Sequence, residues 1–98
     1  MHPSDAIILE WDEANASELA AHHITTNEVD EVFERDNPAW VPNKRGRSGN
    51  WLMIGMTLGG RLLAIVVLLK DDGDTLRPIT GWDADEGERT QYSRKRRR

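Results

Sequence analysis

The chain has 98 residues, of which 38% are apolar and 31% are charged, and its formal net charge is −4. This length suits one small domain, and the composition is typical of a folded protein rather than a disordered one. Disulfides and thiolate metal sites are excluded because the chain contains no cysteine. The longest apolar run, Leu62–Leu69, is too short to span a bilayer, and the first residues do not resemble a secretory signal. We therefore expect a cytoplasmic protein that does not engage a membrane.

The charges are segregated along the chain. Residues 1–36 and 71–88 are strongly acidic, whereas residues 37–70 carry bases and no acid, and the last ten residues are strongly basic. The overall acidity argues against tight nonspecific binding to bulk DNA. A local phosphate-binding site built from the basic middle segment remains open.

The first third of the chain is predicted to form a strand and two helices. Residues 6–9 are apolar and β-branched, which favours a strand, and residues 13–22 are rich in helix formers. Thr25 and Glu28 have the spacing of a capping box, and the helix that they open should end before Pro38. This second helix has one apolar stripe, formed by Val29, Val32 and Phe33.

The rest of the chain is predicted to form strands and a last helix. Residues 38–50 indicate a loop with a short edge strand around Trp40 and Val41. Two apolar runs, 51–58 and 61–69, flank Gly59-Gly60, which predicts a hairpin because both glycines accept a positive φ. Further along, residues 71–74 indicate a turn, residues 76–82 a strand, and the Asp85–Glu88 spacing a helix that runs to Gln91 or Tyr92.

This order of elements predicts an α+β fold. We expect a small antiparallel sheet with the N-terminal helices and the C-terminal helix packed on one face. Residues 1–92 should form the single domain, and residues 93–98 should form a solvated basic tail.

Three segments carry motifs that occur together in one protein family. Glu10-Trp11-Asp12, His22 and Val32-Phe33 resemble the family's E-W-D, K-H-G-V and V-F, in that order. Residues 54–63, IGMTLGGRLL, resemble its hairpin I-G-x-T-x-x-G-R-x-L. Residues 77–92, RPITGWDADEGERTQY, run without a gap against R-I-I-S-A-R-x-A-x-x-x-E-x-x-x-Y. From Glu10 to Tyr92 the chain therefore resembles the BrnT family.

The resemblance implies a fold, an activity and a partner. BrnT proteins are RelE-like ribonuclease toxins of type II toxin–antitoxin systems, which cleave RNA without a metal or other cofactor. A small antitoxin from the same operon neutralises them. The positions that match the family's functional residues are Arg61, Arg77, Glu88, Tyr92 and a histidine, which is His22 by spacing from Phe33 and His23 by spacing from Trp11.

Residue types indicate how such cleavage could proceed. Attack of the 2′-hydroxyl on the adjacent phosphorus needs a base, an acid and cations that stabilise the phosphoryl oxygens. We expect Arg61 and Arg77, on neighbouring strands, to clamp the scissile phosphate. A histidine or Glu88 would transfer the proton. The RNA-binding candidates, for mRNA that is free or ribosome-associated, are Lys44, Arg45, Arg47 and Trp82.

A second function is also open, because the chain departs from the family pattern. Trp82 stands where the motif has the arginine of S-A-R, and Ala21 or His22 stands where it has the lysine. The alternative is a catalytically impaired BrnT-like protein that binds an antitoxin or nucleic acid without cleavage. A plain nucleic-acid-binding module is a third possibility, and it would need its bases and exposed tryptophans on one surface.

The candidate residues also have purely structural explanations. These are a helix end for His22 and His23, an exposed turn for Arg61, a helix cap for Glu88, core packing for Tyr92, and an ion pair with Asp71, Asp72 or Asp74 for Arg77. The four tryptophans, Trp11, Trp40, Trp51 and Trp82, are expected as core or partner-facing anchors, and Trp82 could instead stack on a base.

Overall fold

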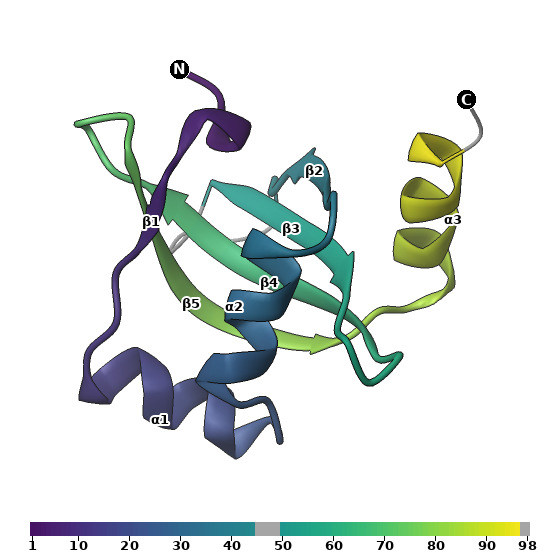
Figure 1. Cartoon of the computed structure of the whole chain (residues 1–98), viewed down its shortest axis with the longest axis horizontal. Helices are drawn as coiled ribbons and strands as arrows, with labels where there is room; N and C mark the ends of the chain where they lie inside the picture. Colours follow the sequence, from purple (N-terminus) through teal and green to yellow (C-terminus); the bar gives the residue numbers. More distant parts are fainter. Residues whose placement is uncertain (45–49, 97–98) are drawn as a thin grey trace.

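A five-stranded sheet with three α-helices forms the described part of the chain, residues 1–44 and 50–96 of a computed structural model (Figure 1). A short 3-10 turn, η1 (Pro3–Asp5), precedes the first strand. The strands are β1 (Ile8–Leu9), β2 (Ala39–Pro42), β3 (Trp51–Met56), β4 (Leu62–Leu69) and β5 (Thr75–Asp83), and the helices are α1 (Glu13–Ala21), α2 (Thr26–Glu34) and α3 (Glu86–Lys95). The predicted α+β architecture is confirmed.

The sheet is mixed rather than fully antiparallel. Its strand order is β1-β5-β4-β3-β2, and β1 pairs with β5 in parallel while every other pair is antiparallel. A parallel pair needs a long connection, and here two helices and three strands separate its members. The expectation of an antiparallel sheet was therefore wrong for β1, and the predicted edge strand β2 is confirmed.

The hairpin between β3 and β4 has a longer turn than predicted. Met56 pairs with Leu62, and the backbone N–H of Thr57 donates to the carbonyl of Arg61 at 2.9 Å. Of the two glycines, Gly60 has a positive φ of 88° and Gly59 does not. The predicted two-residue Gly-Gly turn was wrong, because Thr57 and Arg61 form a further closing pair before the chain turns.

Helices α1 and α2 cover one face of the sheet. Strand residues alternate between faces, so every second side chain of β3 and β4 meets these helices. The core on this side contains Leu19, Ile24, Val29, Val32, Met53, Leu63, Ile65, Val67 and Leu76, with Trp11, Trp40 and Trp51 packed against it. The predicted apolar stripe of α2 is confirmed for Val29 and Val32, and Phe33 is half-buried.

Helix α3 lies on the opposite face. A second, smaller core joins it to β2, β3 and β4 and contains Ala39, Ile54, Leu62, Ala64, Ala84 and Tyr92. The expectation that the helices share one face was therefore wrong for α3, which also continues past Tyr92 to Lys95. Figure 1 shows α3 to one side of the sheet, away from α1. As a result, part of this second face stays open.

Asp36 joins α3 to the rest of the fold. Its Oδ2 accepts from the backbone N–H of Met56 at 2.7 Å and from the Tyr92 hydroxyl at 2.9 Å, and its Oδ1 accepts from Arg96 at 2.6 Å. Gly55 makes room for this carboxylate, since a Cβ there would lie 2.9 Å from Asp36 Oδ2 and 2.7 Å from Val32 Cγ1. Arg96 was expected in a solvated tail, but it forms an ion pair with Asp36 and lies over the Tyr92 ring.

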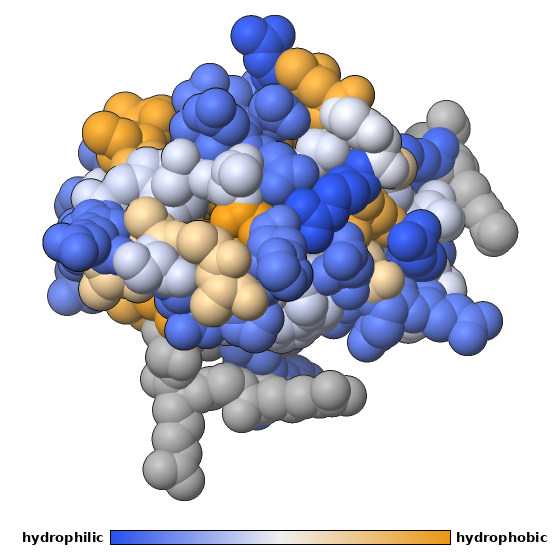
Figure 2. Space-filling model, turned by 90° about the horizontal axis from the view of Figure 1, so that it is seen from below, coloured by the Kyte–Doolittle hydropathy of each residue, from blue (hydrophilic) through white to orange (hydrophobic). Residues whose placement is uncertain are grey.

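The face seen in Figure 2 is mainly hydrophilic. Apolar residues appear there as separate patches among polar ones. Over the described residues, the exposed large apolar side chains are Met1, Ile7, Ile8, Leu58 and Trp82. No helix in this part of the chain is long and apolar enough to cross a membrane.

Candidate functional site

Arg61 is held by one carboxylate at the N-terminus of α2 and by another at the end of β5. Its Nε donates to Asp83 at 3.0 Å, and its Nη1 donates to Glu28 at 3.0 Å and to the carbonyl of His23 at 2.8 Å. These bonds, first that with Asp83 and then that with Glu28, raise the pKa of Arg61 above its ordinary value. The guanidinium therefore ties α2 and the end of β5 to the hairpin turn.

Arg77 is paired in the same way at the start of β5. Its Nη1 lies 3.1 Å from Glu10 Oε1 and 2.9 Å from Asp12 Oδ2. The hydrogen bond from Arg77 is the main cause that lowers the pKa of Asp12 below its ordinary value. An ion pair was one of the structural alternatives for Arg77, but its partners are Glu10 and Asp12 rather than the acids of the 71–74 turn.

The two arginines do not converge. In the register of β4 and β5, Arg77 lies opposite Leu68, while Arg61 precedes the first residue of β4. Seven residues along a strand correspond to roughly 20 Å, which is too far for two side chains to share one phosphate. The prediction that Arg61 and Arg77 clamp the scissile phosphate together was therefore wrong.

The two histidines end α1. His22 is its C-cap residue, and its Nε2 lies 3.0 Å from Glu18 Oε2. His23 follows in the left-handed region with a φ of 61°, where glycine is favoured. Because the resembled motif has glycine after its histidine, this backbone favours His22 as the matching histidine.

Glu18 connects His22 to the open face of the sheet. The same oxygen, Oε2, accepts from the Thr80 hydroxyl at 2.9 Å and contacts His22. The hydrogen bonds from Thr80 and then from His22 lower the pKa of Glu18. Sequence reasoning missed Glu18 and Thr80. The spacing of four residues between Glu18 and His22 on a helix was the signal that could have revealed the first of them.

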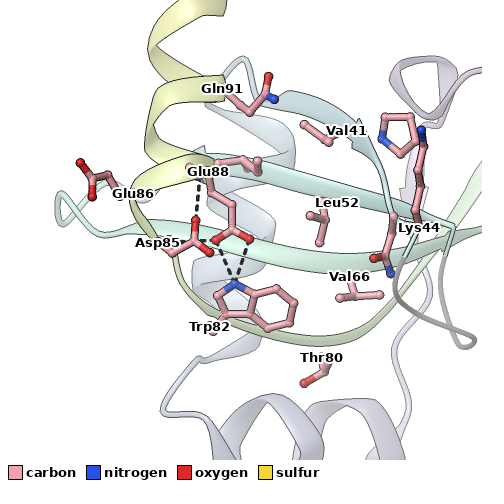
Figure 3. Close-up of a pocket in the computed structure, with 14 residues that line it drawn as sticks. Val41, Lys44, Leu52, Val66, Thr80, Trp82, Asp85, Glu86, Glu88 and Gln91 are labelled. Atoms are coloured by element: carbon pink, nitrogen blue, oxygen red, sulfur yellow. Dashed lines mark hydrogen bonds between the residues drawn. The ribbon is translucent and has the colours of Figure 1, made fainter.

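An open-face pocket of about 730 Å³ lies on the part of the sheet that α3 leaves uncovered (Figure 3). This volume is within the usual range for ligand sites. Val41, Leu52, Ile54 and Val66 contribute apolar side chains, and Thr80, Trp82, Glu88, Gln91 and Lys44 are among the polar and aromatic lining residues. Figure 3 shows Lys44 across the pocket from α3.

Trp82 and Glu88 meet in this pocket. The indole Nε1 donates to Glu88 Oε1 at 2.9 Å and to Oε2 at 3.2 Å, and Trp82 remains 37% exposed. Glu88 also caps α3, since it accepts from the backbone N–H of Asp85 at 2.9 Å. The capping explanation for Glu88 is confirmed, and the indole face of Trp82 stays partly open to a ligand.

The remaining predicted residues lie apart. Tyr92 is the buried residue of α3 and is bonded to Asp36, and its burial is the main cause that raises its pKa. Arg45 and Arg47 lie outside the described residues. Lys44 is therefore the described member of the predicted basic loop, and it lines the open-face pocket.

The described residues include no group of three or more histidine, aspartate or glutamate side chains suited to a metal ion. Carboxylates outnumber cations in the open-face pocket, where Asp85, Glu86 and Glu88 face one lysine, Lys44.

The comparison with protein families gives the class of the protein. Residues 11–88 match the family model described as "Ribonuclease toxin, BrnT, of type II toxin-antitoxin system". No curated protein matches the chain. Because the match covers well over half of the 98 residues, the chain belongs to the BrnT family of type II toxin–antitoxin ribonuclease toxins.

Proposed function

We propose that this toxin cleaves mRNA without a metal ion, by attack of a 2′-hydroxyl on the adjacent phosphorus in the open-face pocket. The observation that supports this most is the position of Glu18, whose Oε2 contacts both His22 and the pocket residue Thr80. A histidine oriented by a carboxylate is a common general base. Here the same carboxylate also accepts from Thr80, which lines an apolar pocket with an exposed indole.

Each step uses residues at this site. A base of single-stranded RNA stacks on Trp82, and Lys44 attracts the phosphate backbone of the RNA. His22 takes the proton of the 2′-hydroxyl, whose oxygen forms a bond to phosphorus as the bond to the 5′ oxygen breaks. The leaving oxygen takes a proton from water, so the products carry a 2′,3′-cyclic phosphate and a 5′-hydroxyl. Glu18 orients the imidazole and stabilises its protonated form.

The proposal gives Arg61, Arg77 and Tyr92 positioning roles, because their polar atoms are bonded to other parts of the fold. Glu88 likewise accepts bonds from Trp82 and from the cap of α3, so it orients the indole. His23 directs its backbone carbonyl to Arg61, and its side chain has no step assigned.

Cleavage of a defined RNA by the purified chain in excess EDTA tests this proposal. We expect 5′-hydroxyl ends with the wild type, a loss of at least about 100-fold with His22→Ala, and near wild-type rates with the neighbouring control His23→Gly. Equal rates for His22→Ala and the wild type would exclude His22 as the base. Cleavage that EDTA abolishes would exclude the metal-free route.

A second candidate, a catalytically impaired protein that binds an antitoxin, is favoured by a specific observation. Arg61 and Arg77 are each paired with two carboxylates, and Trp82 replaces the motif arginine, so no arginine lines the described part of the open-face pocket. Expression in bacteria with and without the neighbouring operon gene separates the two. Growth arrest with new RNA ends supports the nuclease, whereas binding of the neighbour's product without either effect supports the binder.

A further inference from the structure

A second hollow, the edge pocket, adjoins the open-face pocket. It measures about 400 Å³ and is lined by the N-terminal segment, β2 and the last turn of α3, through His2, Ala39, Trp40, Val41, Gln91, Arg94 and Lys95. Val41 and Gln91 line both hollows. In Figure 3 these two side chains lie together at the end of the open-face pocket, between α3 and β2. The two pockets therefore follow one another along the groove between this helix and this strand.

The charge of the edge pocket is opposite to that of its neighbour. Arg94 and Lys95 line it, whereas no carboxylate does so among the described residues. Lys95 Nζ donates to the carbonyl of Pro38 at 2.8 Å, which positions the ammonium without neutralising it. Arg94 is exposed, and no described carboxylate lies within ion-pair distance of either side chain.

This pair of cations differs from three arginines whose charges are paired within the fold. Arg61, Arg77 and Arg96 each lie within 3.1 Å of a carboxylate, so their charges are balanced inside the fold. Basic residues in the last turn of a helix also complement its dipole, and this accounts for their presence on α3. It does not account for two unbalanced cations that line one hollow continuous with the candidate site.

We propose that the edge pocket binds a backbone phosphate of the RNA strand, further along the strand from the phosphate that is cleaved, because the sheet register places Val41 three strands away from Thr80. The guanidinium of Arg94 can donate two parallel bonds to phosphate oxygens, and Lys95 adds a positioned point charge. The strand then runs along β2 and α3, with one phosphate in the edge pocket and a base on Trp82. This assignment rests on the proposed function, because it takes the ligand to be single-stranded RNA.

The cations of the edge pocket also explain how a polyanion can bind beside an acidic open-face pocket. The cleavage region supplies stacking and proton transfer, and the attraction for the backbone comes from the adjoining edge pocket. We therefore expect RNA affinity to depend on Arg94 and Lys95 more than on Arg61 or Arg77, whose charges are already balanced.

The test measures binding of a fluorescent 2′-O-methyl oligoribonucleotide, which cannot be cleaved, to the purified full chain at several salt concentrations. We expect Arg94→Gln to raise Kd about three- to tenfold and Arg94→Gln with Lys95→Gln to raise it further. The slope of the logarithm of the association constant against the logarithm of the salt concentration should become shallower by about 0.7 per lost phosphate contact. Arg89→Gln is the matched control, since Arg89 is an exposed arginine of the same helix that lines neither pocket.

The outcomes separate this inference from the proposed function. If the wild type cleaves RNA and Arg94→Gln leaves the Kd and the salt slope unchanged, the edge-pocket proposal is overturned and the proposed function is not. A higher Kd in Arg94→Gln, with no cleavage by the wild type, would support the edge-pocket proposal and reject the nuclease mechanism. If Arg94→Gln loses antitoxin binding while its RNA binding is unchanged, the edge pocket is not an RNA site. No RNA binding by the wild type would overturn it too.

Discussion

His23 adopts a backbone conformation that its side chain disfavours. Its φ of 61° costs a non-glycine residue about 1–2 kcal/mol. Replacement by glycine removes this cost, but glycine loses more backbone entropy on folding, which offsets part of the gain. We expect His23→Gly to stabilise the fold by about 0.5–1 kcal/mol in urea unfolding. His22→Gly, at the preceding C-cap position without a positive φ, is the control and should not stabilise it. A lower stability of His23→Gly would mean that the imidazole of His23 makes a contact that compensates for the strain.

Glu18 gives the fold a pH dependence with a defined sign. The hydrogen bond from Thr80 lowers its pKa in the folded state, so this carboxylate contributes stability above its unfolded pKa of about 4.3. That contribution is lost as the pH falls through the lower, folded pKa. Thr80→Val should therefore raise the pKa of Glu18, measured by NMR titration of its carboxyl carbon, and make the acid loss of stability less steep.

Thr90→Val is the matched control for this titration, because the Thr90 hydroxyl donates to the carbonyl of Glu86 on α3, away from Glu18. An unchanged Glu18 titration in Thr80→Val would show that the contact with Thr80 does not persist in solution. The connection from His22 to the open-face pocket would then lose its support.

At the scale of elements, the position of α3 depends on one carboxylate. Asp36 accepts bonds from β3, from Tyr92 and from Arg96, and its side chain is only 17% exposed. Asp36→Ala leaves the Met56 N–H and the Tyr92 hydroxyl without a partner, so we expect a loss of roughly 2–3 kcal/mol in unfolding free energy. Tyr92→Phe removes one bond and should cost about 1 kcal/mol. Equal stabilities of Asp36→Ala and wild type would contradict this role.

The elements that were predicted correctly carry local signals. The Thr25–Glu28 and Asp85–Glu88 spacings mark the starts of α2 and α3, and both capping boxes are formed. The face on which α3 lies was not predictable, because it depends on Asp36 and Gly55, residues distant in sequence. The parallel pairing of β1 was unpredictable for the same reason, because its partner β5 is distant from it in the sequence.

At the scale of the whole molecule, the candidate site was predictable only in part. The motif resemblance pointed to Glu88 and Trp82, which line the open-face pocket, and to His22, whose partner Glu18 also contacts the pocket residue Thr80. It could not reveal that Arg61 and Arg77 are paired, because their carboxylate partners come from other segments of the chain. The edge pocket likewise combines His2, β2 and the end of α3, which no linear motif connects.

This distribution of charge leads to a test that covers both ends of the sheet. If Arg61 and Arg77 hold the fold together, then Arg61→Met and Arg77→Met should each lower the Tm by about 4 °C, the scale expected of partly exposed ion pairs. Cleavage assayed well below the Tm should fall less than tenfold, whereas loss of a group that stabilises the transition state costs about 100-fold or more. Arg35→Met, at an arginine that lines neither pocket, is the control for charge removal. A loss of 100-fold in kcat at unchanged Tm would restore these arginines to the chemistry, and it would require the carboxylates that now bind them to release them when RNA arrives.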